Sequence, residues 1–288
     1  AGGGDPMSAP LPAHLSEAAA PAPRIPCATY RLQFNRHFTF EDARQIVPYL
    51  SALGISDLYA SSYLAARPGS LHGYDIADHT RLNPEIGTPA DYDRFVAALT
   101  ERGMGQILDV IPNHMGIAAA CNRWWNDVLE NGPGSPFAEF FDIDWDPVKR
   151  QLANRVLLPI LGDQYGLVLE RQELRLQYRE GGFSLHYYET ALPIAPESVT
   201  QILYHRLPAL LAERGDADPC LQEYQSVIAS LDNLPGRTEI APDRVRARRR
   251  EAEVIRRRLG RLTDTCQAIR DALEDTVRLF NGRRGDPR

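Results

Sequence analysis

The 288-residue chain carries 32 basic and 38 acidic residues, which gives a formal net charge of −6 at pH 7. This mild acidity gives no reason to expect a nucleic-acid partner, and a content of 43% hydrophobic and 24% charged residues is typical of a globular chain with a buried core. No run of 18 apolar residues occurs, so we predict no membrane span. The length allows one large domain or two smaller ones.

The cysteines indicate a reducing environment. The four residues of this type, Cys27, Cys121, Cys220 and Cys266, are widely separated and form no Cys-x-x-Cys motif. Such spacing predicts neither a zinc site nor a disulfide framework, so we expect reduced thiols and a cytoplasmic location. We predict no metal and no cofactor.

Residues 1–25 have the composition of an unstructured terminal tail. They are rich in proline and alanine, have no basic start and contain no continuous apolar segment of the kind that a secretory signal requires. We expect this stretch to be disordered.

From residue 26 the chain alternates strand and helix signals. Residues 28–34 alternate with period two and predict a strand, and Thr39 caps a helix over 40–53. A second strand over 55–59, a loop over 61–84 and a helix over 88–102 follow. With a third strand around Asp109 the order is β-α-β-α-β, which predicts a parallel sheet. Sequence order alone leaves both an open sheet and a barrel possible.

The third strand carries the first candidate site. Residues 105–111 form a short apolar run of the type found in strands buried on both faces. Asp109 inside this run must be paired or hydrogen-bonded, because an isolated buried carboxylate is costly. Asn113 and His114 follow where the strand should end, and ligands bind at the carboxyl ends of such strands. The alternative is a core strand with a satisfied aspartate and a loop histidine.

Beyond Gly116 the pattern changes. We predict a helix over residues 124–129, a loop over 132–136 and a small antiparallel β unit over 140–190. The strand candidates are Arg155–Leu158, Gly166–Leu169, Glu173–Leu176 and Phe183–His186. Helices are expected from Glu197, and residues 244–280 have apolar positions at helical spacing.

Arginine dominates the basic residues. Of the 32, only Lys149 is a lysine, a bias that reflects genomic base composition rather than 31 guanidinium sites. We therefore interpret the arginine-rich face of residues 244–280 as a solvated, salt-bridged surface and not as a polyanion site.

A second candidate site lies in the loop after the second strand, in the sequence His72-Gly73-Tyr74-Asp75. A glycine that lets the backbone turn, an aromatic face that packs on sugar C–H groups and a carboxylate that accepts hydroxyl protons suit a sugar platform. The alternative is a structural turn with Tyr74 as a lid over the core. Two such loops on adjacent strands would open on one face, which favours the sugar platform.

These motifs resemble those of the α-amylase family of glycoside-active enzymes. Asp109 to His114 is similar to the first conserved region of the family, and residues 72–75 to its tyrosine loop. Within the family the resemblance is closest to the maltooligosyltrehalose synthases. It rests on residues 28–34, 56–62, 72–79, 109–116 and 131–145, and it covers residues 26–145 densely.

The resemblance implies the N-terminal part of a (β/α)8 barrel, with a large insertion after the third strand that is β-rich to about residue 190 and then helical. We expect residues 26–120 to form the first three β-α units and residues 121–288 the insertion. The implied enzyme converts the reducing-end α-1,4 bond of maltooligosaccharides to an α,α-1,1 bond by a retaining mechanism.

The chain departs from the family pattern at one decisive point, since no Arg-x-Asp-His segment for the nucleophile occurs. The acid/base and the third carboxylate would come later still. We therefore expect an N-terminal fragment that is inactive by itself.

The resemblance assigns roles to several residues. The implied substrate-binding residues are His72, Tyr74, Asp75 and His114. Asp109 and Asn113 would be structural; the family aspartate pairs with an arginine near the nucleophile, so Asp109 would lack its partner here. Asn113 corresponds to a calcium-binding position of many α-amylases. The sequence offers no further oxygen ligands that would complete the cage of six or more that calcium requires. We expect His72, Tyr74, Asp109 and His114 to converge at the carboxyl ends of the second and third strands.

Two other functions stay open. One is a hydrolase or transglucosylase of the same family, against which residues 131–145 and the helical insertion argue. The other is a non-catalytic sugar-binding scaffold that uses part of a barrel.

Overall fold

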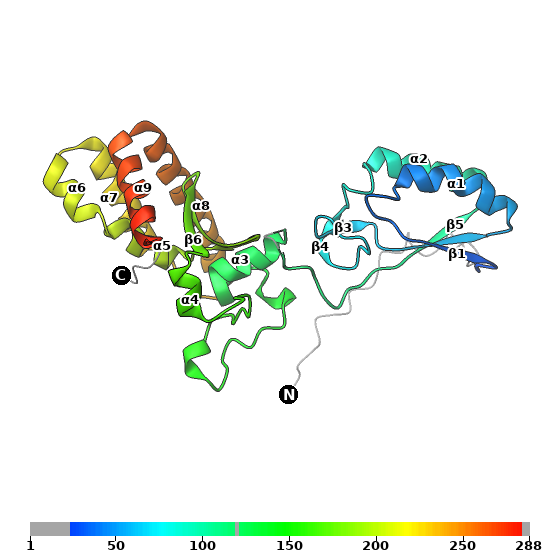
Figure 1. The fold of residues 1–288 in the computed structure, drawn as a ribbon, viewed down its shortest axis with the longest axis horizontal. Coiled ribbons are helices and arrows are strands. Elements are labelled where there is room, and N and C mark those ends of the chain that lie inside the picture. Colours follow the sequence, from blue (N-terminus) through cyan, green and yellow to red (C-terminus); the bar gives the residue numbers. More distant parts are fainter. Residues whose placement is uncertain (1–23, 119–120, 284–288) are drawn as a thin grey trace, which may run out of the picture.

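The computed structural model describes residues 24–118 and 121–283. They form two units with separate hydrophobic cores, and Figure 1 shows an extended connection that leads from the end of the first unit toward the second. The predicted tail lies outside the described residues, apart from its last two. One of these, Arg24, is part of the first unit, because its Nε donates to Asp57 Oδ1 at 2.7 Å.

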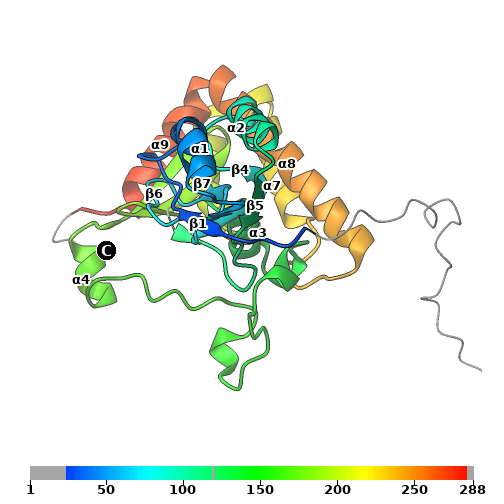
Figure 2. The same cartoon turned by 90° about the vertical axis from the view of Figure 1, so that its right-hand side faces the viewer.

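The first unit is a three-stranded parallel sheet covered by two helices. Its main elements are β1 (Thr29–Leu32), α1 (Phe40–Ala52), β2 (Asp57–Ala60), α2 (Pro89–Glu101) and β5 (Gly105–Leu108). The strand order is β1-β2-β5, and all pairs are parallel. Both views place α1 and α2 over the same face of the sheet (Figure 1, Figure 2). The predicted β-α-β-α-β order and the parallel sheet are confirmed.

Aromatic rings fill the space between the sheet and the helices. Phe34, Phe40, Tyr63 and Phe95 are buried, and the Phe34 ring centroid lies 5.0 Å from that of Tyr63 and 5.6 Å from that of Phe40. Edge-on and tilted ring pairs at these distances stabilise a core beyond their area burial. This core holds β1 and β2 rigidly, and therefore fixes the positions of the side chains at their carboxyl ends.

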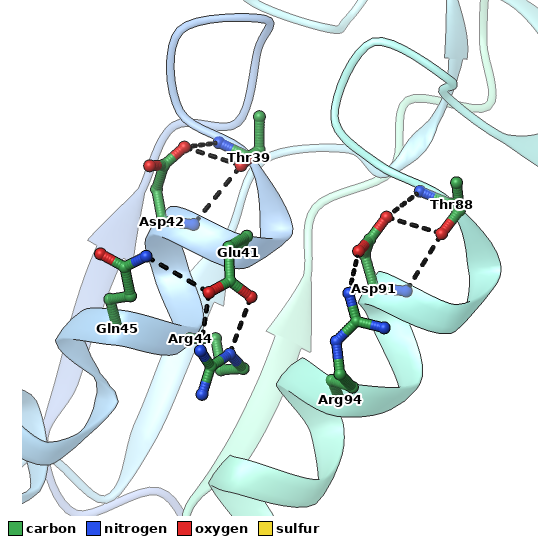
Figure 3. A network of polar contacts seen from close by, with 8 residues as sticks. All are labelled: Thr39, Glu41, Asp42, Arg44, Gln45, Thr88, Asp91 and Arg94. Atoms are coloured by element: carbon green, nitrogen blue, oxygen red, sulfur yellow. Dashed lines mark hydrogen bonds and ion pairs between the residues drawn. The ribbon is translucent and has the colours of Figure 1, made fainter.

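Both helices begin with a capping box (Figure 3). Thr39 Oγ1 accepts from the Asp42 backbone N–H, while Asp42 Oδ2 accepts from the Thr39 N–H at 2.8 Å. Thr88 and Asp91 repeat the arrangement. These bonds satisfy N–H groups that have no partner within the helix. The helix starts predicted at residues 39–40 and 88–89 are confirmed.

Thr39→Ala is expected to lower the free energy of unfolding of the first unit by about 1 kcal/mol, because the cap hydroxyl is lost and the Asp42 N–H is left without its acceptor. Urea denaturation followed by far-ultraviolet circular dichroism measures the loss. Thr39→Ser keeps the hydroxyl and is the control. If Thr39→Ser loses as much as Thr39→Ala, the cap is not the source of the effect.

The predicted loop over residues 61–84 is wrong in part, because it contains a hairpin. β3 (Leu64–Ala66) pairs antiparallel with β4 (Ile76–Leu82), with register shifts between the pairs. Ile76 and Ala77 are buried. The sequence did not indicate the hairpin, because β3 has only three residues and the segment between the strands contains Pro68-Gly69 and Gly73, which are typical of loops.

The prediction that residues 105–111 form a strand buried on both faces is also wrong. β5 ends at Leu108, and Ile107 and Leu108 are 37% and 41% exposed. β5 pairs with β2 on one side, and within the described residues no strand pairs with its other side. An apolar run can therefore mark an edge strand whose outer side is uncovered.

The second unit combines short helices, an antiparallel sheet and a helical bundle. Its elements are α3 (Arg123–Asn131), the 3-10 turns η3 (Gly132–Gly134), η4 (Ala138–Phe140) and η5 (Arg150–Leu152), α4 (Tyr165–Glu170), β6 (Leu174–Arg179), β7 (Gly182–Tyr187), β8 (Thr190–Pro193), α5 (Pro196–Tyr204), α6 (Leu207–Arg214), α7 (Pro219–Asp232), α8 (Pro242–Thr265) and α9 (Gln267–Phe280). None of the described helices is both long and apolar enough to cross a membrane.

The sheet β6-β7-β8 is antiparallel, as predicted for part of residues 140–190. Two of the strand candidates are wrong. Gly166–Leu169 lies in α4, where Val168 alone is buried, and Arg155–Leu158 forms no regular element. The sheet packs through Leu176 and Phe183 against the bundle of the second unit.

The predicted helical pattern of residues 244–280 is confirmed as two helices, α8 and α9, which are separated at Cys266 by an extended backbone conformation. Arginines of α8 pair with acidic side chains, as predicted: Arg256 Nη2 lies 2.8 Å from Glu130 Oε1, and Arg258 Nε lies 2.9 Å from a Glu223 oxygen. Arg248 differs, because its side chain is only 2% exposed.

Candidate functional site

Four side chains meet at the carboxyl ends of β1, β2 and β5. The parallel register places Arg31 of β1 beside Tyr59 of β2. Tyr59 Oη donates to Asp109 Oδ2 at 2.9 Å, and Tyr74 Oη donates to the same oxygen at 2.8 Å. Asp109 follows β5 directly, and its backbone N–H still bonds Ala60 O at 2.9 Å. The sheet therefore presents this carboxylate at the end where ligands bind in α/β proteins.

Arg31 supplies the positive charge of this cluster. Its Nη2 donates to Tyr74 Oη at 2.5 Å, its Nη1 lies 3.5 Å from Asp109 Oδ2, and its guanidinium carbon lies 4.9 Å from the centroid of the Tyr59 ring. The arginine that was expected to be missing is the one near the nucleophile, and in this chain Arg31 is the cation beside Asp109. Hydrogen bonds from Tyr74 and Tyr59, together with Arg31, hold the pKa of Asp109 below its ordinary value.

Asp109→Asn is expected to make the stability of the chain less sensitive to acid. A carboxyl group whose folded-state pKa lies below its unfolded value of 3.8 stabilises the fold above that value, and this stabilisation is lost as the pH falls through the folded-state pKa. The difference in unfolding free energy between wild type and Asp109→Asn should therefore be largest above about pH 5 and shrink toward about pH 2. Urea titrations across this range measure it, and a constant difference would contradict the linkage.

The tyrosine loop forms a second layer of the cluster. The rings of His72 and Tyr74 lie nearly parallel, with centroids 6.1 Å apart and an interplanar angle of 13°. His72 Nδ1 accepts from the Tyr74 backbone N–H at 3.1 Å, so in the neutral imidazole the proton is on Nε2. That nitrogen lies 4.0 Å from Asp75 Oδ2. Gly73 makes the turn, with a φ of +77° that favours glycine.

Asp75 lies between His72 and a second arginine. Its Oδ2 is 3.8 Å from Arg67 Nε, and its backbone carbonyl accepts from the Arg67 N–H at 3.0 Å. Its Oδ1 is buried and has no hydrogen-bond partner among the described residues. The Asp75 side chain is 25% exposed, and because Oδ1 is buried, Oδ2 is the oxygen that a hydroxyl-bearing ligand can reach.

Gly116 fastens the loop after β5 to the start of β4. Its N–H donates to Ile76 O at 2.8 Å, and a Cβ atom at this position would lie 2.5 Å from Asp75 O. Contacts of that length do not occur, so the approach requires glycine. The segment that carries Asn113 and His114 is thereby held next to the tyrosine loop.

His114 itself does not join the cluster. Its Nδ1 lies 3.0 Å from Asn113 Oδ1, and within the described residues no hydrogen bond or ring contact connects it to Tyr74 or Asp109. It borders a hollow of about 550 Å³ instead, whose wall also includes Trp125, Phe140, Asp142, Asp144, Pro147 and Arg155. The structure thus brings His72, Tyr74, Asp75 and Asp109 together and leaves Asn113 and His114 at the neighbouring hollow.

Two members of the cluster, Arg31 and Tyr59, were not among the predicted site residues. Both lie in predicted strands, and both would face the same side of the sheet as Asp109 if the strands are aligned in parallel. The sequence of one strand does not show how it is aligned with the next. Arg31 and Tyr59 could therefore have been found only by first predicting the register between the strands.

The chain is similar to the α-amylase class of enzymes. Residues 43–166 match the family model described as alpha amylase, catalytic domain. The resemblance inferred from residues 72–75 and 109–114 is thereby confirmed, together with the α/β class of the fold. The matched segment includes Tyr59, Tyr74, Asp109 and His114, whereas Arg31 precedes it.

Among particular relatives, the putative maltooligosyl trehalose synthase of Mycobacterium tuberculosis is 41% identical over 177 residues, which is 59% of this chain and 22% of the relative. The solved maltooligosyltrehalose synthase of Arthrobacter ramosus is 43% identical, with a TM-score of 0.52 over 59% of this chain and 21% of the other. Alpha-amylase SusG of Bacteroides thetaiotaomicron is 32% identical over 114 residues, 40% of this chain and 16% of that protein. The chain spans about a fifth of the length of the trehalose-forming relatives.

Proposed function

We propose that this chain is a segment of a (1→4)-α-D-glucan 1-α-D-glucosylmutase and supplies part of its maltooligosaccharide site. The observation that carries the proposal is the hydrogen-bonded cluster of Arg31, Tyr74 and Asp109 at the carboxyl ends of the strands. Tyr74 and Asp109 lie in the segment that matches the alpha amylase family model, and 59% of the chain is similar to a maltooligosyl trehalose synthase. The finer architecture belongs to the same proposal: residues 26–120 start a (β/α)8 barrel, and residues 121–288 are an insertion after its third strand.

The reaction exchanges one bond of an anomeric carbon for another. The α-1,4 bond at the reducing end breaks, a carboxylate nucleophile takes the glycosyl group, and an acid donates a proton to the departing glucose oxygen. The anomeric hydroxyl of that glucose then attacks and loses its proton, which forms the α,α-1,1 bond. A retaining route of this kind needs two carboxyl groups about 5–5.5 Å apart.

The two carboxylates of this site do not serve as the catalytic pair. Asp109 accepts from two tyrosines and Asp75 faces Arg67, and neither corresponds to the nucleophile or the acid of the family. The described segment therefore binds and orients sugar, with the Tyr74 ring under the sugar and with His72, Asp75 and His114 bonding hydroxyl groups. Asn113 supports the loop of His114. We place the protein in the cytoplasm, because its cysteines are free within the described residues.

A hydrolase or transglucosylase of the same family is the second candidate function. The alpha-amylase similarity covers 40% of this chain, whereas the trehalose-synthase similarity covers 59%. The additional matched length favours the mutase. A non-catalytic scaffold would use the same cluster to bind sugar and would form no product from it.

The test is to incubate the purified chain with maltopentaose and follow it by NMR. We expect saturation transfer from protein to sugar that is lost in Tyr74→Ala, no new reducing ends and no α,α-1,1 product, because members of a catalytic set act as a unit. Turnover that disappears in Asp109→Asn or Asp75→Asn would overturn the assignment of these residues to binding. Absence of saturation transfer in the wild type would overturn the sugar site.

A further inference from the structure

Arg31 belongs to the 28–34 motif, and the proposed function gives it no task of its own within the cluster. We propose that Arg31 is a positioning residue that fixes Tyr74 through its phenol oxygen, so that Tyr74 offers a sugar its ring face and no hydroxyl proton. This inference deepens the proposed function and rests on it for the identity of the ligand.

The Tyr74 hydroxyl group makes two hydrogen bonds, one as donor and one as acceptor. A phenol has one proton to donate and can accept hydrogen bonds at its oxygen. The proton goes to Asp109 Oδ2 at 2.8 Å, and the oxygen accepts from Arg31 Nη2 at 2.5 Å. Both bonds involve a charged partner and are therefore stronger than neutral ones. The hydroxyl has no second proton for a ligand.

Arg31 is itself held from three directions. Its guanidinium lies over the Tyr59 ring at 4.9 Å, it faces Asp109 at 3.5 Å, and its backbone is fixed in β1. A planar guanidinium suits this position, because it can contact an aromatic face and direct separate N–H groups at Tyr74 and Asp109. The ring of Tyr74 is thus oriented before any ligand arrives, which lowers the entropic cost of binding.

A consequence for the ligand follows from this geometry. The half-buried ring contributes a flat apolar surface that suits the C–H face of a glucose unit. Within the cluster, hydroxyl recognition is left to His72 Nε2 and to Asp75 Oδ2, which lie 4.0 Å apart. The cluster therefore recognises a sugar by shape on one side and by hydrogen bonding on the neighbouring side.

The first arm of the test needs no sugar. In Arg31→Gln, the pKa of Asp109 and the pKa of the Tyr74 phenol should both rise, because Arg31 lowers both. Carbon-13 NMR titration of labelled aspartate and tyrosine measures these shifts. Arg94→Gln is the matched control: it removes an exposed arginine of the first unit that pairs with Asp91 on α2, and it should move neither value.

The second arm measures maltopentaose affinity in a double-mutant cycle. Arg31→Gln and Tyr74→Phe should each weaken binding by about fivefold, and the double variant should be no weaker than either single one, since both remove the same constraint. Tyr74→Ala should lose binding altogether. Arg31→Lys keeps the charge without the planar fork, so it should restore the two pKa values in part while binding stays weak.

The outcomes separate the two proposals. If both pKa values rise and the two effects on affinity are not additive, the role of Arg31 is supported. Unchanged pKa values in Arg31→Gln, or effects of Arg31→Gln and Tyr74→Phe that simply add, overturn it. If the pKa values rise but the wild type does not bind maltopentaose, the constraint on Tyr74 holds and the sugar assignment of the proposed function fails.

Discussion

Replacing Gly181 by alanine is expected to destabilise the second unit by about 3–5 kcal/mol, from left-handed backbone strain plus a clash that forces packed elements apart. Gly181 lies in the turn between β6 and β7 with a φ of +80°. A Cβ atom there would lie 1.9 Å from Arg256 O and 2.8 Å from Gly260 N, both in the backbone of α8. Helix backbone has little freedom to move aside, so the sheet and α8 must separate.

Gly215→Ala is the matched control for this effect. Gly215 has a φ of +74° at the end of α6, and no atom lies within 4 Å of its added Cβ. It should therefore lose only the strain term of about 1 kcal/mol. Tryptophan fluorescence during urea denaturation reports the second unit, because Trp124, Trp125 and Trp145 all follow residue 122. Equal losses in the two variants would show that the contact with α8 is unimportant.

Arg248→Ala should lower the free energy of unfolding by about 3 kcal/mol, because it opens a cavity at a buried side chain and leaves partly buried acceptors without donors. The guanidinium donates to the Pro235 carbonyl and, through Nε, to Asn131 Oδ1 at 3.3 Å, and its Nη2 lies 3.0 Å from Glu197 Oε1. These contacts join α3, α5 and the connection before α8. Loss of the side chain should therefore loosen three elements together.

Arg250→Ala, two residues along the same helix, is the control for helix propensity and charge. The Arg250 side chain is 72% exposed, so its removal should change the free energy of unfolding by less than about 0.5 kcal/mol. Arg248→Met keeps most of the volume and separates packing from hydrogen bonding. If Arg248→Met is as stable as the wild type, the hydrogen bonds of Arg248 do not contribute to stability.

The parts of the fold that were predicted correctly depend on local signals. Thr39 and Thr88 begin helices through contacts within three residues, and the apolar spacing of residues 244–280 is a property of one segment. The hairpin β3–β4 was not predicted because β3 has only three residues, and α4 was not predicted because it is short and shows no apolar periodicity in its burial. Val168, for example, is buried while its two neighbours in the chain are exposed.

The candidate site shows the same division. The residues His72, Tyr74, Asp75 and Asp109 could be proposed from short motifs, and the structure brings them together. Arg31 could not, because its role depends on which residue of β2 it faces and on a loop more than 40 positions away. His114 was expected beside Tyr74 since both follow strand ends, but the path of the connection after Leu108 carries it to the neighbouring hollow.

Lys149, which precedes the 3-10 turn η5, is a site for selective chemical labelling of this chain. It is exposed, and it is the one side-chain primary amine in the sequence. Pro147 and Leu152, on either side of it in the chain, line the hollow that His114 borders. Apart from a free α-amino terminus, an amine-selective fluorophore would therefore label one place, and its emission would follow occupation of that hollow without any engineered cysteine.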